Sequence, residues 1–173
     1  MITPEHFFVN EMASPLGTLT IIATERGVCQ IHFAALHELN GQSKLLKTGV
    51  REEWERCESR TSAVCEQLQA YFNGTRKSFD VDIDLVGTPF QKKVWRALMD
   101  INYGETRSYK EIAKQIGAPK AVRAIGGANN RNPLPIIVPC HRVIGSNGAM
   151  VGYGGGLNKK ELLLHLEGAL TIS

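Results

Sequence analysis

The sequence predicts an α+β fold in two parts, a small antiparallel sheet with one helix followed by a mostly helical half. The N-terminal residues hold short apolar runs rich in β-branched side chains, separated by a glycine turn. The second half holds successive segments with helix start and stop signals. The composition changes at Gly87, so we place the boundary there and expect domains at 1–86 and 87–173.

Charge is distributed unevenly between these two parts. Residues 1–86 carry 8 Lys+Arg against 12 Asp+Glu, a net charge of −4, whereas residues 87–173 carry 12 against 5, a net charge of +7. Such asymmetry indicates a surface for nucleic acid or another polyanion in the second half. An ordinary solvated lysine-rich face is the alternative.

Composition excludes several other classes of protein. Apolar residues make up 43% of the chain, which is ordinary for a globular protein, and no apolar run approaches the ~20 residues of a membrane span. The N-terminus lacks the basic start and long apolar core of a signal peptide. The four cysteines form no CxxC pair, which favours a reduced, cytoplasmic protein over a disulfide scaffold.

The first part contains three predicted elements after a β-rich start. Residues 18–24 and 28–33 flank Glu25-Arg26-Gly27 and predict a hairpin. Residues 34–60 show no clear period and receive no assignment. Residues 61–72 predict a helix that Asn73-Gly74 ends. Residues 79–85 alternate strictly, so we expect a strand with its three aspartates on a solvated face.

The second part begins with two capping boxes. Thr88-Pro89-Phe90-Gln91 opens a helix with an apolar face from Phe90 to Ile101, and Ser108-Tyr109-Lys110-Glu111 opens a second helix that ends at Gly117. A third helix is expected from Pro119 to about Ala128. Two short helices joined by a tight turn form a helix-turn-helix pattern. Its basic side chains favour DNA contact over an ordinary helix pair; they are Lys110, Lys114, Lys120 and Arg123.

A final helix is expected near the C-terminus. Asn158-Lys-Lys-Glu161 has the pattern of a helix cap. Four leucines recur at helical spacing after it and are expected to face the core; they are Leu162, Leu163, Leu166 and Leu170. Glu167 lies among them, either on the surface or drawn inward by a histidine.

The stretch 135–145 carries the most distinctive chemistry. Prolines at 135 and 139 fix φ and remove two backbone donors, so we expect a rigid extended strut leading into Cys140. His141 and Arg142 follow at once, and cationic neighbours lower the pKa of a thiol. Cys140 is therefore a candidate nucleophile, with an ordinary buried cysteine as the alternative. Cys29, Cys57 and Cys65 lack such neighbours and are expected to be structural.

These residues resemble a known family, the O6-alkylguanine-DNA alkyltransferases (methylated-DNA–protein-cysteine methyltransferases). Pro139-Cys140-His141-Arg142-Val143 is similar to the active-site motif of that family, and the similarity covers nearly all of 87–168 in order and spacing. The segments that carry it include 88–91, 104–109, 121–128, Asn132-Pro133, 155–157 and 165–168. The first part matches only in pattern, and the resemblance implies a ribonuclease H-like domain at 1–86 and a winged-helix-like domain at 87–173.

The resemblance implies a role for each site residue. Cys140 would accept the alkyl group, His141 would act as its base through a water, and Glu167 would hold the histidine. Asn132 would brace the turn before Cys140, and Tyr109 would donate a proton toward guanine N3. The implied DNA contacts, led by the finger residue Arg123, are Ser108, Tyr109, Arg123, Ala124, Gly126 and Gly127. The implied base pocket consists of Pro135, Val143, Tyr153 and Gly154, with carbonyls of Cys140 and Val143 accepting from the guanine amino group.

The implied reaction is DNA repair in a single turnover. An alkyl group would pass from O6-alkylguanine, and from O4-alkylthymine, to Cys140, and the thioether has no hydrolytic route back. The implied partner is double-stranded DNA with the alkylated base flipped out, bound through the minor groove. A cytoplasmic monomer is expected, with cooperative binding to DNA left open.

Three departures from the family pattern stand out. Relatives often carry serine where this chain has Gly154, so a hydroxyl donor near guanine O6 is lost. The four zinc ligands of some relatives' first domains are not reproduced, so no metal and no cofactor are expected. Asn129-Asn130-Arg131 also differs from the family at the end of the recognition helix.

Two other functions remain open at this point. A lesion-sensing DNA-binding protein without chemistry would share the helix-turn-helix, although such relatives replace the cysteine that is present here as Cys140. A cysteine hydrolase would use Cys140 and His141 but would leave the basic helices unexplained.

Overall fold

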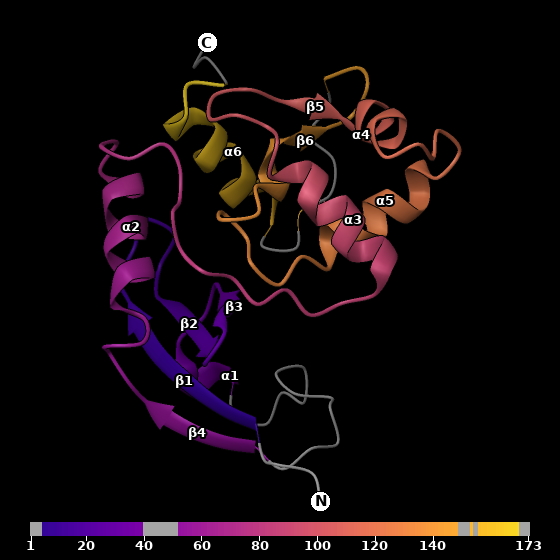
Figure 1. The fold of residues 1–173 in the computed structure, drawn as a ribbon. Coiled ribbons are helices and arrows are strands. Elements are labelled where there is room, and N and C mark those ends of the chain that lie inside the picture. Colours follow the sequence, from indigo (N-terminus) through magenta and orange to yellow (C-terminus); the bar gives the residue numbers. More distant parts are fainter. Residues whose placement is uncertain (1–4, 40–51, 149–152, 154–155, 170–173) are drawn as a thin grey trace, which may run out of the picture. The chain divides into compact units, whose positions relative to one another are not determined.

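The structure is a computed structural model and describes residues 5–39, 52–148, 153 and 156–169 (Figure 1). The chain divides into two compact units, Met1–Leu85 and Val86–Ser173. The first unit is built on a sheet and the second is mostly helical, so the predicted α+β class is confirmed. Among the described helices, none is long and apolar enough to cross a membrane.

A four-stranded sheet of order β3-β2-β1-β4 forms the centre of the first unit. The predicted hairpin is confirmed as an antiparallel pair, and the first strand joins it in antiparallel fashion. The fourth strand pairs in parallel with the first and lies in a segment that received no assignment. The elements are β1 (Glu5–Met12), β2 (Leu19–Thr24), β3 (Gly27–His32), α1 (Leu36–Leu39) and β4 (Glu52–Arg56).

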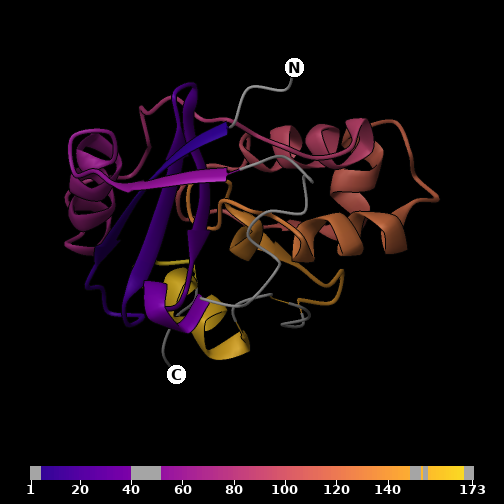
Figure 2. The same cartoon turned by 90° about the horizontal axis from the view of Figure 1, so that it is seen from below.

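The two faces of this sheet have different partners. Phe7 and Val9 of β1 pack with Ile22, Cys29 and Leu36 in one apolar cluster. Side chains of β1 on the other face point toward α2 (Ser62–Phe72), and Asn10 donates to Sγ of Cys65 on that helix. Figure 2 shows α2 lying on one face of the sheet. Alternation along β1 therefore supplies both layers of the core.

Residues 79–85 do not form the predicted strand. They are extended, but only a single bridge joins Ile83 to Val28, with hydrogen bonds from Val28 N–H to Asp82 O and from Asp84 N–H to Val28 O. A Cβ on Gly27 would lie 2.5 Å from Asp82 O, so only glycine permits this approach. The aspartates are not uniformly solvated either, because Asp84 accepts from Thr24 Oγ1 and Arg26 Nε.

The end of α2 confirms its predicted stop signal. Gly74 has φ +79°, a conformation that favours glycine, and Thr75 N–H donates to Ala70 O at 2.9 Å. At the other end the Thr61 hydroxyl makes no cap to the helix and donates instead to preceding carbonyls. The helix is therefore closed by backbone geometry at its C-terminus alone.

The second unit contains three packed helices, a two-stranded ladder and a final helix. Both predicted capping boxes are present, Thr88 with Gln91 and Ser108 with Glu111. The helix expected from Pro119 begins at Val122 and continues to Asn130, so its predicted bounds were wrong. The elements are α3 (Pro89–Leu98), β5 (Arg107–Ser108), α4 (Tyr109–Gln115), α5 (Val122–Asn130), the 3-10 helix η1 (Cys140–Arg142), β6 (Val143–Ile144) and α6 (Leu157–Leu166).

The final helix differs from expectation in two respects. Its N-cap is Gly156 with φ +102°, and no side chain caps it, so the predicted cap at Asn158 was wrong. Leu163 is fully buried, but Leu162 is 42% exposed, and Leu170 lies outside the described residues. The inward face also carries Lys160, which is fully buried.

Candidate active site

The run before Cys140 is a tight turn, not the extended strut that its prolines predicted. Ile136 is buried and has φ +78°, which is unfavourable for a β-branched residue. Val138 N–H donates to Leu134 O at 2.9 Å and closes the turn. At Pro139, φ −80° and ψ 65° form an inverse γ-turn in which Cys140 N–H donates to Val138 O at 2.7 Å. Fixed proline φ values thus support a sharp reversal here.

Asn132 connects both ends of this turn. Its Oδ1 accepts from Leu134 N–H at 2.9 Å, and its Nδ2 donates to Val138 O at 2.7 Å. A strained turn persists only when its surroundings fix it, and this side chain supplies two such bonds. The placement agrees with the bracing role that the family resemblance implies.

Cys140 and His141 lie in η1, where the backbone turns between them. In an extended chain their side chains would point to opposite faces. The 3-10 turn is not extended, so this restriction does not apply to Cys140 and His141. Cys140 is 4% exposed and His141 is fully buried.

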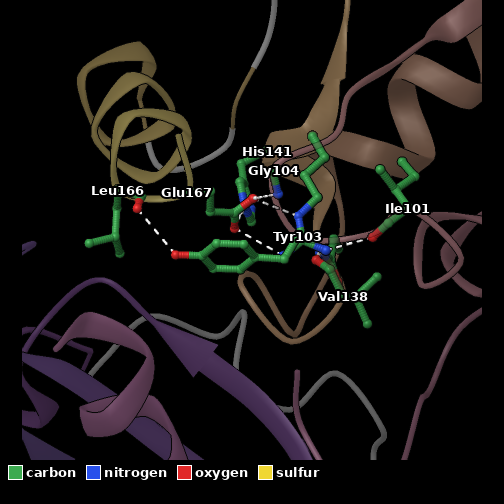
Figure 3. A network of polar contacts seen from close by, with 9 residues as sticks. Ile101, Tyr103, Gly104, Val138, His141, Leu166 and Glu167 are labelled. Atoms are coloured by element: carbon green, nitrogen blue, oxygen red, sulfur yellow. Dashed lines mark hydrogen bonds and ion pairs between the residues drawn. The ribbon is translucent and has the colours of Figure 1, made fainter. Parts of the chain in front are cut away.

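Glu167 is the centre of a buried polar network that includes His141 (Figure 3). Its Oε2 lies 2.7 Å from His141 Nε2. Arg142 donates from Nε to Oε1 at 2.8 Å and from Nη2 to Oε2 at 3.0 Å. The Gly104 N–H donates to Oε1 at 3.3 Å, and Arg142 Nη1 also donates to Ile101 O at 2.6 Å. Four donors converge on this carboxylate, so it is held as an ionised acceptor.

This network defines the proton positions on His141. Burial lowers the pKa of His141, so its imidazole is neutral near pH 7. Because Glu167 only accepts, Nε2 carries the hydrogen and Nδ1 carries the lone pair. Nδ1 is buried and has no hydrogen-bond partner among the described residues. His141, the residue next to Cys140, therefore has a buried ring nitrogen with a free lone pair.

Burial governs the acidity of Cys140 more strongly than its neighbours do. It raises the pKa of the thiol to about 11, against smaller opposing effects of hydrogen bonds from Asn132 and Tyr153 and the charge of Lys160. The prediction that His141 and Arg142 lower the pKa of Cys140 was wrong, because that pKa is raised and neither residue is among its causes. The Arg142 guanidinium pairs with Glu167, and the cation whose charge acts on the sulfur is Lys160.

Lys160 is a site residue that the sequence did not reveal. It lies on α6, and its Nζ donates to Val143 O at 2.5 Å, directly after η1. Burial lowers the pKa of this lysine to about 8, and the Cys140 thiolate charge opposes that shift. A lysine within Asn158-Lys-Lys-Glu161 has no local signal that separates it from a solvated one.

Tyr109 lies close to Cys140 and shares a partner with it. Asn129 Nδ2 lies 3.4 Å from both the Tyr109 hydroxyl and Cys140 O. Burial, followed by the charge of Cys140, raises the pKa of Tyr109. Asn129 is 2% exposed and was noted in the sequence only as a departure from the family pattern.

The residues of the helix-turn-helix differ in exposure. Arg123 and Ala124 are exposed on α5, whereas Ser108 is buried as the cap of α4. A Cβ on Gly126 would lie 4.0 Å from the Tyr109 ring, so α5 passes directly over that tyrosine. A Cβ on Gly127 would instead lie 3.0 Å from Nη1 of Arg131.

The expected base pocket is described in part. Pro135 and Val143 are buried, and Tyr153 is half-buried. Gly154 lies outside the described residues. The structure thus brings together Cys140, His141, Glu167, Asn132 and Tyr109, while Arg123 lies on the exposed face of α5.

Comparison with known proteins gives a consistent result over both units. Residues 89–169 match the 6-O-methylguanine DNA methyltransferase, DNA binding domain, and residues 9–85 match its ribonuclease-like domain. A methylated-DNA–protein-cysteine methyltransferase of Methanosarcina acetivorans is 51% identical, over 90% of this chain and 95% of the relative. One of Mycobacterium bovis is 49% identical, over 89% and 88% respectively.

Solved structures show the same similarity. Mycobacterium tuberculosis OGT in complex with DNA matches with a TM-score of 0.77 and 45% identity, covering 95% of this chain and 93% of that one. The O6-methylguanine-DNA methyltransferase of Pyrococcus kodakaraensis matches with a TM-score of 0.61 and 26% identity, covering 94% and 99%. The chain belongs to the 6-O-methylguanine DNA methyltransferase family.

Proposed function

We propose that this chain repairs DNA by moving the alkyl group of O6-alkylguanine, and of O4-alkylthymine, directly onto Sγ of Cys140. The observation that carries the proposal is the buried contact in which Glu167 fixes His141, the residue next to Cys140, and leaves its Nδ1 without a hydrogen-bond partner among the described residues. This arrangement has the logic of a nucleophile, a base and a carboxylate that orients the base.

The first step is proton transfer from the thiol. With a pKa of about 11, roughly one thiol in ten thousand is ionised at pH 7. A base is therefore required, and His141 Nδ1 accepts the proton through a bridging water. The imidazolium is stabilised by Glu167, which Arg142 and Gly104 hold in place.

The second step is a direct displacement at the alkyl carbon. A C–S bond forms to Cys140 as the C–O6 bond breaks, and its electron pair stays with the guanine. Tyr109 donates a proton toward guanine N3, which neutralises the leaving base. The product thioether is not hydrolysed, so each molecule acts once.

The substrate must leave the duplex to react. Cys140 is only 4% exposed, and an atom inside stacked DNA does not reach such a thiol. We infer that DNA lies against α4 and α5 through its minor groove, with Arg123 filling the space of the flipped base. Pro135, Val143, Tyr153 and Gly154 would line the pocket, and Ser108, Ala124, Gly126 and Gly127 would approach the strand.

The two units divide the work in this proposal. The predicted domain at 87–173 carries both DNA binding and chemistry, and the predicted domain at 1–86 is ribonuclease H-like. We expect a monomer, and the four free thiols suit the reducing cytoplasm.

Stoichiometry separates alkyl transfer from the two rival functions. The protein is incubated with excess duplex DNA carrying O6-methylguanine, and its intact mass is measured over time. Alkyl transfer predicts that one methyl group is gained per molecule and that the reaction then stops. Binding without a mass change would favour a lesion sensor, and repeated hydrolysis of an ester or peptide substrate would favour a hydrolase.

A further inference from the structure

Lys160 is the one fully buried lysine in the described part of the chain, and the mechanism above does not use it. It lies on the inward face of α6, which packs against η1. Its Nζ donates to the carbonyl of Val143, the residue that follows η1. A buried ammonium is costly unless it is paired, so a buried lysine on the helix that packs against η1 calls for an explanation.

Charge coupling identifies Cys140 as one group that interacts with Lys160. Arg142, the other buried cation here, is engaged by Glu167 through two hydrogen bonds. The negative charge that acts on Lys160 is that of the Cys140 thiolate, and the positive charge of Lys160 acts in return on Cys140. The coupling between the two groups is thus reciprocal.

We propose that Lys160 is a positioning residue for the reaction, whose buried ammonium, fixed on the Val143 carbonyl, stabilises the thiolate of Cys140 while it attacks the alkyl carbon. The Val143 bond holds the charge in place, so no reorganisation is needed as the sulfur ionises. This role rests on the proposed alkyl transfer and adds to it the source of the compensating charge.

The proposal gives a particular pH dependence. Proton transfer from Cys140 to His141 leaves the total number of protons unchanged, so the transfer rate is level with pH while Lys160 is charged and His141 is neutral. Because the pKa of Lys160 is about 8, the rate falls as pH rises through that value. The other titratable groups around the sulfur are His141 on η1, Tyr109 on α4, Tyr153, and the paired Glu167 and Arg142. Among them, Tyr109 has a raised pKa, which places its titration at higher pH.

Two substitutions separate charge from packing. Lys160→Gln keeps a donor for Val143 O but removes the charge, whereas Lys160→Arg keeps a charge that does not titrate in this range. Lys159→Gln is the matched control on the same helix. Single-turnover transfer is measured at saturating O6-methylguanine duplex from pH 6.5 to 9.5, so that DNA affinity does not limit the rate.

The expected pattern has three parts. Lys160→Gln transfers at least about tenfold more slowly at pH 7, which corresponds to one unit of thiol pKa, and shows no break near pH 8. Lys160→Arg retains most of the wild-type rate at pH 7 and also lacks the break. Lys159→Gln reproduces the wild-type profile. A profile of Lys160→Gln that matches wild type, or equal losses in Lys160→Gln and Lys160→Arg at every pH, overturns the proposal.

A second measurement keeps this test independent of alkylated DNA and of the folding of one variant. Alkylation of Cys140 by iodoacetamide, followed by peptide mass analysis across pH, reports the thiolate directly in the wild type and all variants. A lower rate in Lys160→Gln with recovery in Lys160→Arg supports the role of Lys160 even if wild-type protein fails to repair DNA. If Lys160→Gln does not fold, the wild type alone provides the test. A rate of Cys140 alkylation by iodoacetamide that shows no change in its pH dependence near pH 8 overturns the proposal.

Discussion

Nε2 of His141 lies 2.7 Å from Oε2 of Glu167, and neither side chain is exposed to solvent. This pair fixes the tautomer of the histidine, because the carboxylate accepts and the imidazole donates. It also connects the C-terminal end of α6 to η1, so the chemistry of Cys140 depends on how the last helix is held.

Replacing Glu167 with glutamine is expected to slow alkyl transfer by roughly 10²–10⁴-fold, the usual contribution of a positioned base. The amide presents an N–H₂ group as well as an oxygen, so the His141 tautomer is no longer fixed. Loss of the charge also leaves Arg142 buried without its ion pair, which costs roughly 3–5 kcal/mol of stability. Single-turnover rates and urea unfolding measure the two effects. The control is Glu161→Gln on the exposed side of the same helix, and a Glu167→Gln rate equal to that of the control contradicts the assigned role.

Acid is expected to destabilise the protein in a window that begins at about pH 6.5. Burial lowers the pKa of His141 in the folded state, so the unfolded chain takes up the proton first as pH falls. Stability is therefore lost below pH 6.5, by about 1.4 kcal/mol for each unit of pKa difference. Unfolding free energies of wild type and His141→Gln between pH 5 and 7.5 check this, and the variant should have the weaker slope.

The first unit contributes to the same window, because burial also lowers the pKa of His32. His32→Gln therefore serves as the comparison. If the unfolding free energy still falls with acid in His141→Gln but no longer does so in His32→Gln, the effect belongs to His32, and the prediction for His141 is contradicted.

Gly126→Ala is expected to separate stability from DNA binding. Alanine in a helix interior gains about 0.5–1 kcal/mol over glycine, and the new Cβ meets the Tyr109 ring only at an ordinary 4.0 Å. Binding to duplex DNA should weaken, because a methyl group then stands between the α5 backbone and the strand. Thermal unfolding and fluorescence anisotropy with a labelled duplex measure both quantities. Unchanged affinity would show that the α5 backbone does not approach DNA at this position.

Arg123→Ala is expected to impair repair of duplex lesions more than reaction with a free O6-alkylguanine base. The arginine is exposed on α5, and we propose that it contributes to extrusion of the base, a step that the free base does not need. The measurement is the ratio of the alkyl-transfer rate with the duplex lesion to the rate with the free base, in the wild type and in Arg123→Ala. The matched control is Arg96→Ala, an exposed arginine on α3, and an equal loss on both substrates for Arg123→Ala would refute the finger role.

The structural features that depend on only a few neighbouring residues could be predicted from the sequence. The capping boxes at Thr88 and Ser108 and the stop at Gly74 depend on neighbouring residues alone, and all three are present. The strand β4 was not predicted, because Glu-Glu-Trp-Glu-Arg has no alternation and its parallel pairing with β1 is set by distant residues.

In the site, too, the features that depend on residues distant in sequence were not predicted. The Pro135–Val138 turn depends on the positive φ of Ile136 and on bonds from Asn132, neither of which proline spacing reveals. Lys160 becomes part of the site only because α6 packs its inward face against η1. The partner of Arg142 was likewise hidden, since Glu167 is far away in sequence.

The most direct test of the central claim is to locate the transferred methyl group. Wild-type protein and Cys140→Ala are each incubated with duplex DNA containing O6-methylguanine, digested, and analysed by peptide mass. The account predicts one methyl group on Cys140 of the wild type, with guanine restored in the DNA, and none on the variant. A methyl group on Cys29, Cys57 or Cys65, or repair of the DNA by Cys140→Ala, would contradict it.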